Sequence, residues 1–164
     1  MKLRNGQTDE WYTPKYIFEA LNIEFDLDPC HPLEKTFVPA KRWYTKNENG
    51  LHQVWHGLVW MNPPFGGRNG YFPWVEKFLE HGNGIGLFTS LTSSEGFQKY
   101  IPKMDAILFP KTKTRFIKPN GEEGGNPFHG VVLFSKGENA TNALRYSGLG
   151  IFLEIQKTVN DNKF

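Results

Sequence analysis

A continuous apolar run at residues 58–61 (LVWM) is followed at once by Asn62, Pro63 and Pro64. A run that is apolar at every position is typical of a strand buried on both faces of a parallel sheet. Because two successive prolines cannot continue a central strand, the chain must leave the sheet here. The segment therefore favours an α/β protein in which a short buried strand ends in a stiff polar corner, residues 62–64.

Helix and strand patterns alternate along the rest of the chain. Thr13 is expected to be the N-cap of a helix through residue 21 with Pro14 at its first position, and Ser94 is expected to cap a helix through residue 100. The pattern predicts a further helix at 71–81, strands at 23–28, 58–61, 84–89 and 106–109, paired strands at 115–117 and 130–134, and a helix and a strand after residue 139. Residues 31–56 look irregular. This order predicts one α/β domain over residues 1–164, a mostly parallel central sheet flanked by helices, with seven strands or slightly fewer.

Composition excludes several classes of protein. The hydrophobic share of 38% and the charged share of 22% are those of a globular protein. A single cysteine, Cys30, allows no intrachain disulfide, which suits a reducing compartment. The first residues are polar, and no stretch approaches the ~18 apolar residues of a membrane span, so we expect a soluble, cytoplasmic protein with no membrane partner.

Charge and aromatic content leave two interpretations open. The net charge of +2 is too small to indicate nucleic-acid binding by itself. Basic residues gather between positions 99 and 118, as either a solvated edge or a surface that follows phosphates: Lys99, Lys103, Lys111, Lys113, Arg115 and Lys118. The aromatic share of 15% fits a bulky core for most rings, whereas Phe65 is a candidate for stacking on a base.

A zinc site is a weaker hypothesis. His52 and His56 have i, i+4 spacing, and Cys30 and His31 lie upstream. Nothing indicates that the histidine segment is helical, and no second ligand pair has metal-like spacing, so we expect no metal. No phosphate-binding loop and no Ser/His/Asp order suggests nucleotide hydrolysis or acyl transfer.

The polar corner and the ring that follows it can carry chemistry. Ligands of open α/β sheets bind beyond the carboxyl ends of the strands. There, the Asn62 side-chain oxygen and the Pro63 carbonyl can accept hydrogen bonds from one group that bears two N–H donors, while Phe65 stacks on its ring. An exocyclic amino group has these donors, and two acceptors outside the ring plane direct its lone pair toward an electrophile in the transition state. The plainer alternative is a strand-ending turn without a ligand.

Residues 62–65 (NPPF) resemble the [DNS]-P-P-[YFW] motif of S-adenosylmethionine-dependent amino-methyltransferases. Further segments are similar, in the same order, to the small phage and prophage DNA N-6-adenine methyltransferases of the Dam type. They are residues 9–14 (DEWYTP), 25–30 (FDLDPC), 49–51 (NGL), Trp55, 57–65, 115–116 (RF) and 127–134 (PFHGVVLF). The resemblance spans roughly residues 8–135.

This resemblance implies a Rossmann-like fold and methyl transfer from S-adenosyl-L-methionine to the N6 amino group of adenine in double-stranded DNA. The target adenine would be flipped out of the duplex, in a bacterial host cell and in a restriction-modification setting. The implied catalytic residues are Asn62, Pro63, Pro64 and Phe65. The implied cofactor-binding residues are Trp11, Thr13, Pro14, Asp28, Pro29 and Asn62. The implied DNA-binding residues are Phe65, Arg68, Lys111, Lys113 and Arg115.

The sequence departs from the family pattern at two places. Residues 29–32 (PCHP) replace the glycine-rich turn that usually follows the first strand, and Phe65 replaces the commoner tyrosine. Asp28 is therefore either a ligand-binding or a turn-capping carboxylate. Two other functions stay open: methyl transfer to another amino group, on guanine N2, an RNA base or a glutamine amide, and a non-catalytic DNA-binding protein that retains the fold.

Overall fold

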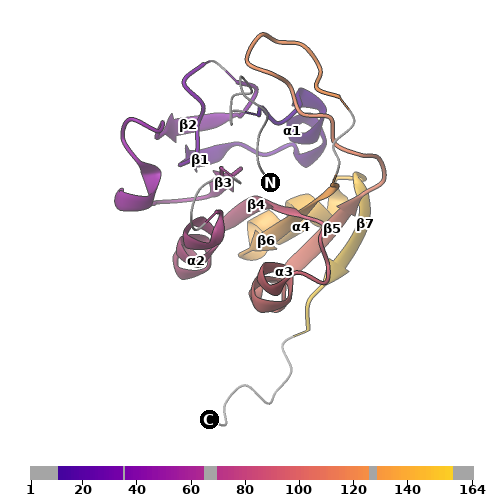
Figure 1. Cartoon of the computed structure of the whole chain (residues 1–164). Helices are drawn as coiled ribbons and strands as arrows, with labels where there is room; N and C mark the ends of the chain where they lie inside the picture. The colour runs from indigo at the N-terminus through magenta and orange to yellow at the C-terminus, as the bar shows by residue number, and fades with distance from the viewer. Residues whose placement is uncertain (1–10, 35, 65–69, 126–128, 157–164) are drawn as a thin grey trace.

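The computed structural model describes residues 11–34, 36–64, 70–125 and 129–156, and within these residues four α-helices surround one seven-stranded sheet (Figure 1). The helices are α1 (Lys15–Leu21), α2 (Phe72–His81), α3 (Glu95–Tyr100) and α4 (Glu138–Tyr146), with 3-10 turns η1 (Gly50–His52) and η2 (Ile101–Lys103). The strands are β1 (Phe25–Asp28), β2 (Ala40–Trp43), β3 (Val59–Met61), β4 (Gly84–Thr89), β5 (Ala106–Pro110), β6 (Val131–Lys136) and β7 (Gly150–Glu154). None of the described helices is long and apolar enough to cross a membrane.

The sheet has the order β2-β1-β3-β4-β6-β5-β7 and consists of a parallel and an antiparallel half. The pairs β1–β2, β1–β3 and β3–β4 are parallel, whereas β4–β6, β5–β6 and β5–β7 are antiparallel. The sheet is therefore mixed, and the expected parallel pairing holds for the first half. Seven strands agree with the prediction.

One predicted strand pair is wrong. The segment at residues 115–117 does not pair with β6, because Ile117 bridges to Tyr12 and to Glu123 instead. β6 lies between β4 and β5, where four of its residues are fully buried: Val132, Leu133, Phe134 and Ser135. A strand buried on both faces needs two neighbours, and the apolar pattern does not say which strands these are.

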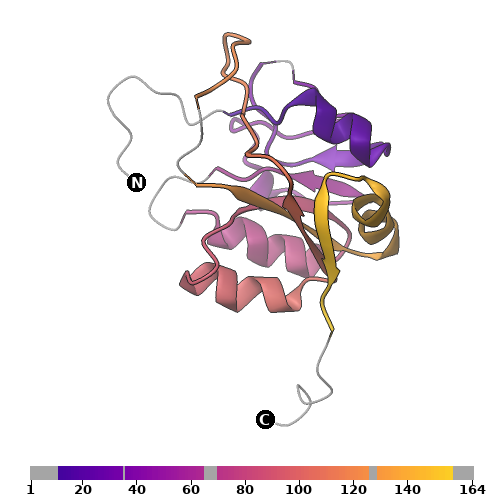
Figure 2. The same cartoon turned by 90° about the vertical axis from the view of Figure 1, so that its right-hand side faces the viewer.

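Helices cover both faces of the sheet, so the fold has three layers (Figure 2). The core beneath α2 and α3 includes Trp74, Val75, Phe78, Phe97 and Tyr100. The opposite core, beneath α1 and α4, includes Ile17, Phe18, Leu21, Ala140 and Leu144. Trp60 of β3 is completely buried in this second core, and its ring meets Phe18 edge-on with centroids 4.8 Å apart. Most aromatic side chains therefore build the core, as expected.

Most predicted elements are confirmed, while β2 was missed. The predicted helices at 71–81 and 94–100, the four predicted single strands and the final helix and strand all form, with shifts of a residue or two. β2 lies in the stretch expected to be irregular. Its Lys41, Arg42 and Trp43 are exposed on an edge strand, so it lacks the apolar alternation that marks a half-buried strand.

A hydrogen-bonded carboxylate fixes the start of β3 against β1. The Asp26 and Leu27 backbone N–H groups both donate to the Leu58 carbonyl, at 2.8 and 3.3 Å, and the Asp26 carboxylate accepts from Leu58 N at 2.8 Å. The Leu58 N–H and then Lys41 lower the pKa of this carboxyl below its ordinary value. Gly57 adjoins this contact with φ of +65°, and a Cβ there would lie 2.3 Å from the Asp26 carboxylate. The position therefore excludes any side chain.

Gly57→Ala should destabilise the protein more than Gly148→Ala. Gly148 has a similar φ of +66°, but a Cβ at this position would have no atom within 4 Å, so its replacement reports the left-handed backbone alone. We expect alanine in this left-handed conformation to cost about 1 kcal/mol in the free energy of unfolding. The clash with Asp26 should add roughly 1–3 kcal/mol at Gly57. Urea unfolding measures both free energies, and equal losses would show that the Asp26 contact yields without cost.

Candidate functional site

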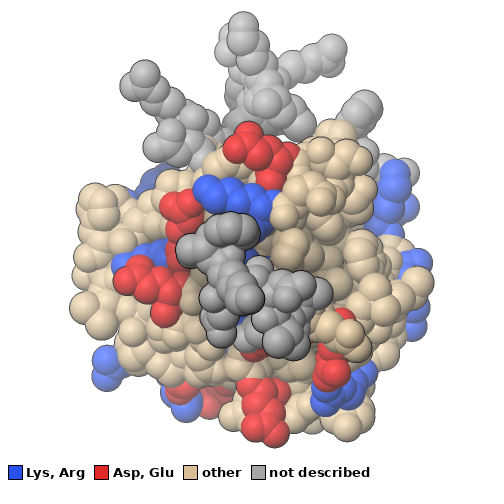
Figure 3. All heavy atoms as spheres, turned by 90° about the horizontal axis from the view of Figure 1, so that it is seen from below, with Lys and Arg blue, Asp and Glu red and all other residues tan. Residues whose placement is uncertain are grey.

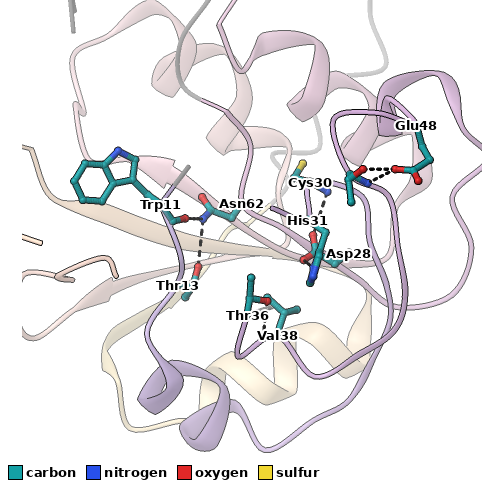
Figure 4. Close-up of polar contacts among 10 residues, drawn as sticks. Trp11, Thr13, Asp28, Cys30, His31, Thr36, Val38, Glu48 and Asn62 are labelled. Atoms are coloured by element: carbon teal, nitrogen blue, oxygen red, sulfur yellow. Dashed lines mark hydrogen bonds and ion pairs between the residues drawn. The ribbon is translucent and has the colours of Figure 1, made fainter. Parts of the chain in front are cut away.

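Two polar residues predicted for the site lie at the carboxyl ends of the neighbouring strands β1 and β3. β1 and β3 are neighbours, but the chain continues from β1 to β2 on one side and from β3 to β4 on the other. In open α/β sheets, ligands bind beyond the carboxyl ends of the strands at such a switch point. Asp28 is the last residue of β1 and Asn62 directly follows β3. The fold thus brings them to the same edge of the sheet (Figure 4).

The orientation of the Asn62 amide is fixed by two acceptors. Its Nδ2 donates to the Trp11 carbonyl at 3.0 Å and to Thr13 Oγ1 at 3.3 Å. Because a carbonyl can only accept, the NH₂ group and not the Oδ1 atom must face the Trp11 carbonyl, and Figure 4 shows both bonds of this group. Among the described contacts, Oδ1 accepts no hydrogen bond. Asn62 therefore braces the Trp11 backbone and still presents an acceptor.

The predicted N-cap role of Thr13 is wrong. The N-cap position of α1 is Pro14, without a side-chain cap, and the helix begins at Lys15. The Thr13 side chain is 2% exposed and its hydroxyl oxygen accepts from Asn62 instead. A hydroxyl is a good cap only when it faces the first turn, and here the long-range bond turns it toward β3.

The N-terminal segment connects the polar corner to the long connection between β5 and β6. Tyr12 exchanges two backbone hydrogen bonds with Ile117, at 2.9 and 2.8 Å. The Trp11 ring lies against Gly124, where a Cβ would come within 2.8 Å of it. Residues 11–13 therefore contact Asn62 on one side and the 115–124 segment on the other.

The Asp28 carboxylate caps the turn that stands in place of the glycine-rich one. It is 2% exposed, its Oδ1 accepts from Cys30 N at 3.1 Å, and its Oδ2 lies 2.8 Å from His31 Nδ1. Burial raises the pKa of Asp28, while the hydrogen bond from His31 acts in the opposite direction. The His31 ring stacks on Trp43, the last residue of β2, with centroids 5.2 Å apart. The sequence did not predict this stack, because Trp43 belongs to β2, the strand that was not predicted.

Cys30 is partly buried and packs against the core. Burial raises the pKa of its thiol well above the ordinary value, and the charge of Asp28 adds to this. Only a small fraction of the thiol is therefore the reactive thiolate at neutral pH.

The basic residues between positions 99 and 118 do not form one surface. Lys99 and Lys103 precede β5 and the remaining four follow it, so the two groups lie at opposite ends of that strand. Lys99 is paired with Glu76 at 3.2 Å. The face seen in Figure 3 carries acidic and basic side chains side by side. The predicted DNA-binding residues Lys111, Lys113 and Arg115 are exposed and lie in the group that follows β5.

The remaining predicted site residues differ in where the structure places them. Phe65 and Arg68 lie outside the described residues. Pro63 is buried and Pro64 is exposed, and their catalytic role stays a prediction. Pro14 and Pro29 are buried, without a test of cofactor binding. In the part of the chain that the structure describes, no three metal-ligating side chains cluster, and His52 is an exposed residue of η1.

The fold and site define an α/β protein with a polar corner at the switch point of its sheet. Residues 1–143 match the family of DNA N-6-adenine-methyltransferases (Dam), and the chain belongs to this family. No curated protein matches the chain, and no solved structure does.

Thr13→Val should loosen the Asn62 amide, whereas Thr13→Ser should keep it fixed. Valine has nearly the shape of threonine but cannot accept the hydrogen bond from Nδ2. We expect a loss of about 1 kcal/mol in the free energy of unfolding, and faster exchange of an Asn62 side-chain amide proton with water in NMR spectra. Equal exchange rates in the two variants would show that Thr13 does not orient Asn62.

Cys30 should react with iodoacetamide more slowly in the folded protein than in the unfolded protein at the same pH. A raised pKa lowers the thiolate fraction, and only the thiolate attacks. Alkylation at pH 8, with and without urea and followed by mass spectrometry, measures both rates. A folded-state rate equal to the unfolded one would contradict the raised pKa.

Proposed function

We propose that this protein transfers a methyl group from S-adenosylmethionine to the N6 amino group of adenine in DNA. The observation that carries the proposal is the orientation of Asn62 at the switch point, where its NH₂ group is bound to Trp11 and Thr13 and its oxygen is left as an acceptor. Membership of the DNA N-6-adenine-methyltransferase family supports the choice of adenine in DNA.

The proposed role of the polar corner is to hold the target nitrogen. The Asn62 oxygen and the Pro63 carbonyl accept the two hydrogens of the amino group, and proline leaves no competing N–H at this position. Two acceptors outside the base plane favour a pyramidal nitrogen, which is stabilised more in the transition state than in the ground state. Phe65, which follows the corner, stacks on the base. A paired adenine is out of reach, so the nucleotide is flipped.

The residues at the switch point fit the cofactor. S-adenosylmethionine supplies a methyl group on a positively charged sulfonium, and it also carries an ammonium and hydroxyl groups. Asp28 offers a buried carboxylate. Thr89, at the end of β4, has a buried hydroxyl that forms no hydrogen bond with any residue that the structure describes. The residues that would hold the cofactor are Trp11, Thr13, Pro14, Asp28, Pro29 and Asn62. The doubly wound order β2-β1-β3-β4 supports a Rossmann-like half for the sheet.

The acceptor is tested by supplying methyl-labelled S-adenosylmethionine with DNA, RNA and protein in parallel. The proposal expects label in DNA alone, recovered as N6-methyladenine after digestion to nucleosides. Label in RNA or in protein glutamine would contradict the proposal and show that the protein methylates another amino group. Calorimetry without measurable cofactor binding would favour a non-catalytic DNA-binding protein.

Asn62→Ala should abolish most turnover while cofactor binding persists, because the other five residues proposed to hold the cofactor are unchanged. By analogy with a donor of an oxyanion hole, the loss of one oriented acceptor lowers kcat by roughly 10²–10³. Calorimetry with S-adenosylmethionine and the initial methylation rate measure the two effects separately. Asn47→Ala, at an exposed turn, is the matched control and should retain both properties. Full activity of Asn62→Ala would contradict the mechanism.

A further inference from the structure

The connection between β5 and β6, residues 111–130, is longer than the ~12–15 residues beyond which loops without secondary structure are uncommon. Its described part contains a hairpin, residues 115–124. Lys118 N donates to the Glu122 carbonyl at 2.9 Å, and Gly124 N donates to the Phe116 carbonyl at 2.7 Å. Residues 115–124 therefore fold back on themselves as a two-stranded ribbon, with Ile117 bridged to Glu123.

The tip of the 115–124 hairpin is stiff. Gly121 N donates to the Lys118 carbonyl at 2.9 Å, and Gly121 has φ of +84°. Pro119 and Asn120 occupy the two central positions of this turn, where proline presets φ and asparagine is favoured. A left-handed glycine after such a turn is a common hairpin closure. Little conformational freedom is left to lose on binding.

The base of the hairpin is fixed beside the polar corner. Tyr12 pairs with Ile117, Trp11 packs on Gly124, and the Trp11 carbonyl accepts from Asn62. Figures 1 and 2 show the hairpin standing clear of the sheet on the side of α1. A substrate that contacts the hairpin therefore has a defined position relative to Asn62.

The exposed side chains of the hairpin combine donors with acceptors. Arg115 pairs with Glu123 at 2.8 Å, and Lys118 pairs with Glu122 at 3.4 Å. A surface that follows phosphates needs cations without opposing carboxylates. In contrast, the edges of bases present both donors and acceptors: arginine and lysine recognise guanine, asparagine recognises adenine, and glutamate recognises cytosine. Exposed ion pairs contribute at most about 1 kcal/mol, so they can exchange partners on binding.

We propose that the 115–124 hairpin enters the major groove of DNA and recognises base pairs beside the target adenine. The major groove is wide enough for a two-stranded ribbon. This inference rests on the proposed function and names the element that sets its sequence preference. The side chains that make the contacts are Arg115, Lys118, Asn120, Glu122 and Glu123.

The test maps N6-methyladenine in a pool of random-sequence duplex DNA for the intact protein and for Lys118→Ala, Asn120→Ala and Glu122→Gln. Each variant should still methylate DNA, with its discrimination among bases at a flanking position reduced at least about tenfold. Lys99→Ala is the matched control, because Lys99 is also an exposed lysine in an ion pair but lies on α3. It should keep the preference of the intact protein. Thermal melting checks that all variants fold.

The outcomes separate the two proposals. The recognition role is overturned if the hairpin variants keep the sequence preference of the intact protein. It is also overturned if the intact protein methylates adenine without any preference for the flanking bases. Folded hairpin variants that lose methylation on every sequence also contradict it, because the hairpin would then serve the reaction and not the choice of site. If the intact protein methylates no DNA, the proposed function fails. Sequences enriched by binding alone, from the same pool, then decide whether the hairpin recognises bases.

Discussion

The side-chain amide of Asn62 holds the carboxyl end of β3 to the N-terminal segment, and the geometry of the site depends on this contact. Its two N–H groups are bonded to the Trp11 carbonyl and to the buried Thr13 hydroxyl. Since the carbonyl cannot donate, the contact also dictates where the Asn62 oxygen points. One interaction therefore joins distant parts of the chain and orients the atom on which the proposed chemistry relies.

The two halves of the sheet contribute different parts of the molecule. The parallel half, β2-β1-β3-β4, creates the switch point at whose edge Asp28 and Asn62 both lie. The antiparallel half places β6 between β4 and β5, so the chain between β5 and β6 returns at the same edge of the sheet. That arrangement explains why the 115–124 hairpin stands beside the polar corner. Substrate recognition and chemistry can therefore be assigned to neighbouring elements of one small sheet.

Carboxylates determine which lysine and arginine side chains are free to bind phosphates. Glu76, Glu122 and Glu123 each pair with a lysine or arginine that the sequence suggested for a phosphate-binding surface. Asp28 is turned inward to cap the turn after β1, which leaves it a buried and partly satisfied acceptor. Many charged side chains thus form local ion pairs, and the net charge of the chain is small. This distribution suits recognition by matched donors and acceptors more than attraction at long range.

The sequence by itself determined the elements whose pattern is local: the buried strand β3, its end at two prolines, the helix capped by Ser94, and Asn62 as the polar residue beyond the sheet. Only the tertiary structure decided the partners of β6, the exposed edge strand β2, and the bond that takes Thr13 from helix capping to Asn62. The reason is physical. Apolar periodicity and turn chemistry act between residues near in sequence, whereas strand order and the direction of a side-chain amide depend on groups that only folding brings together.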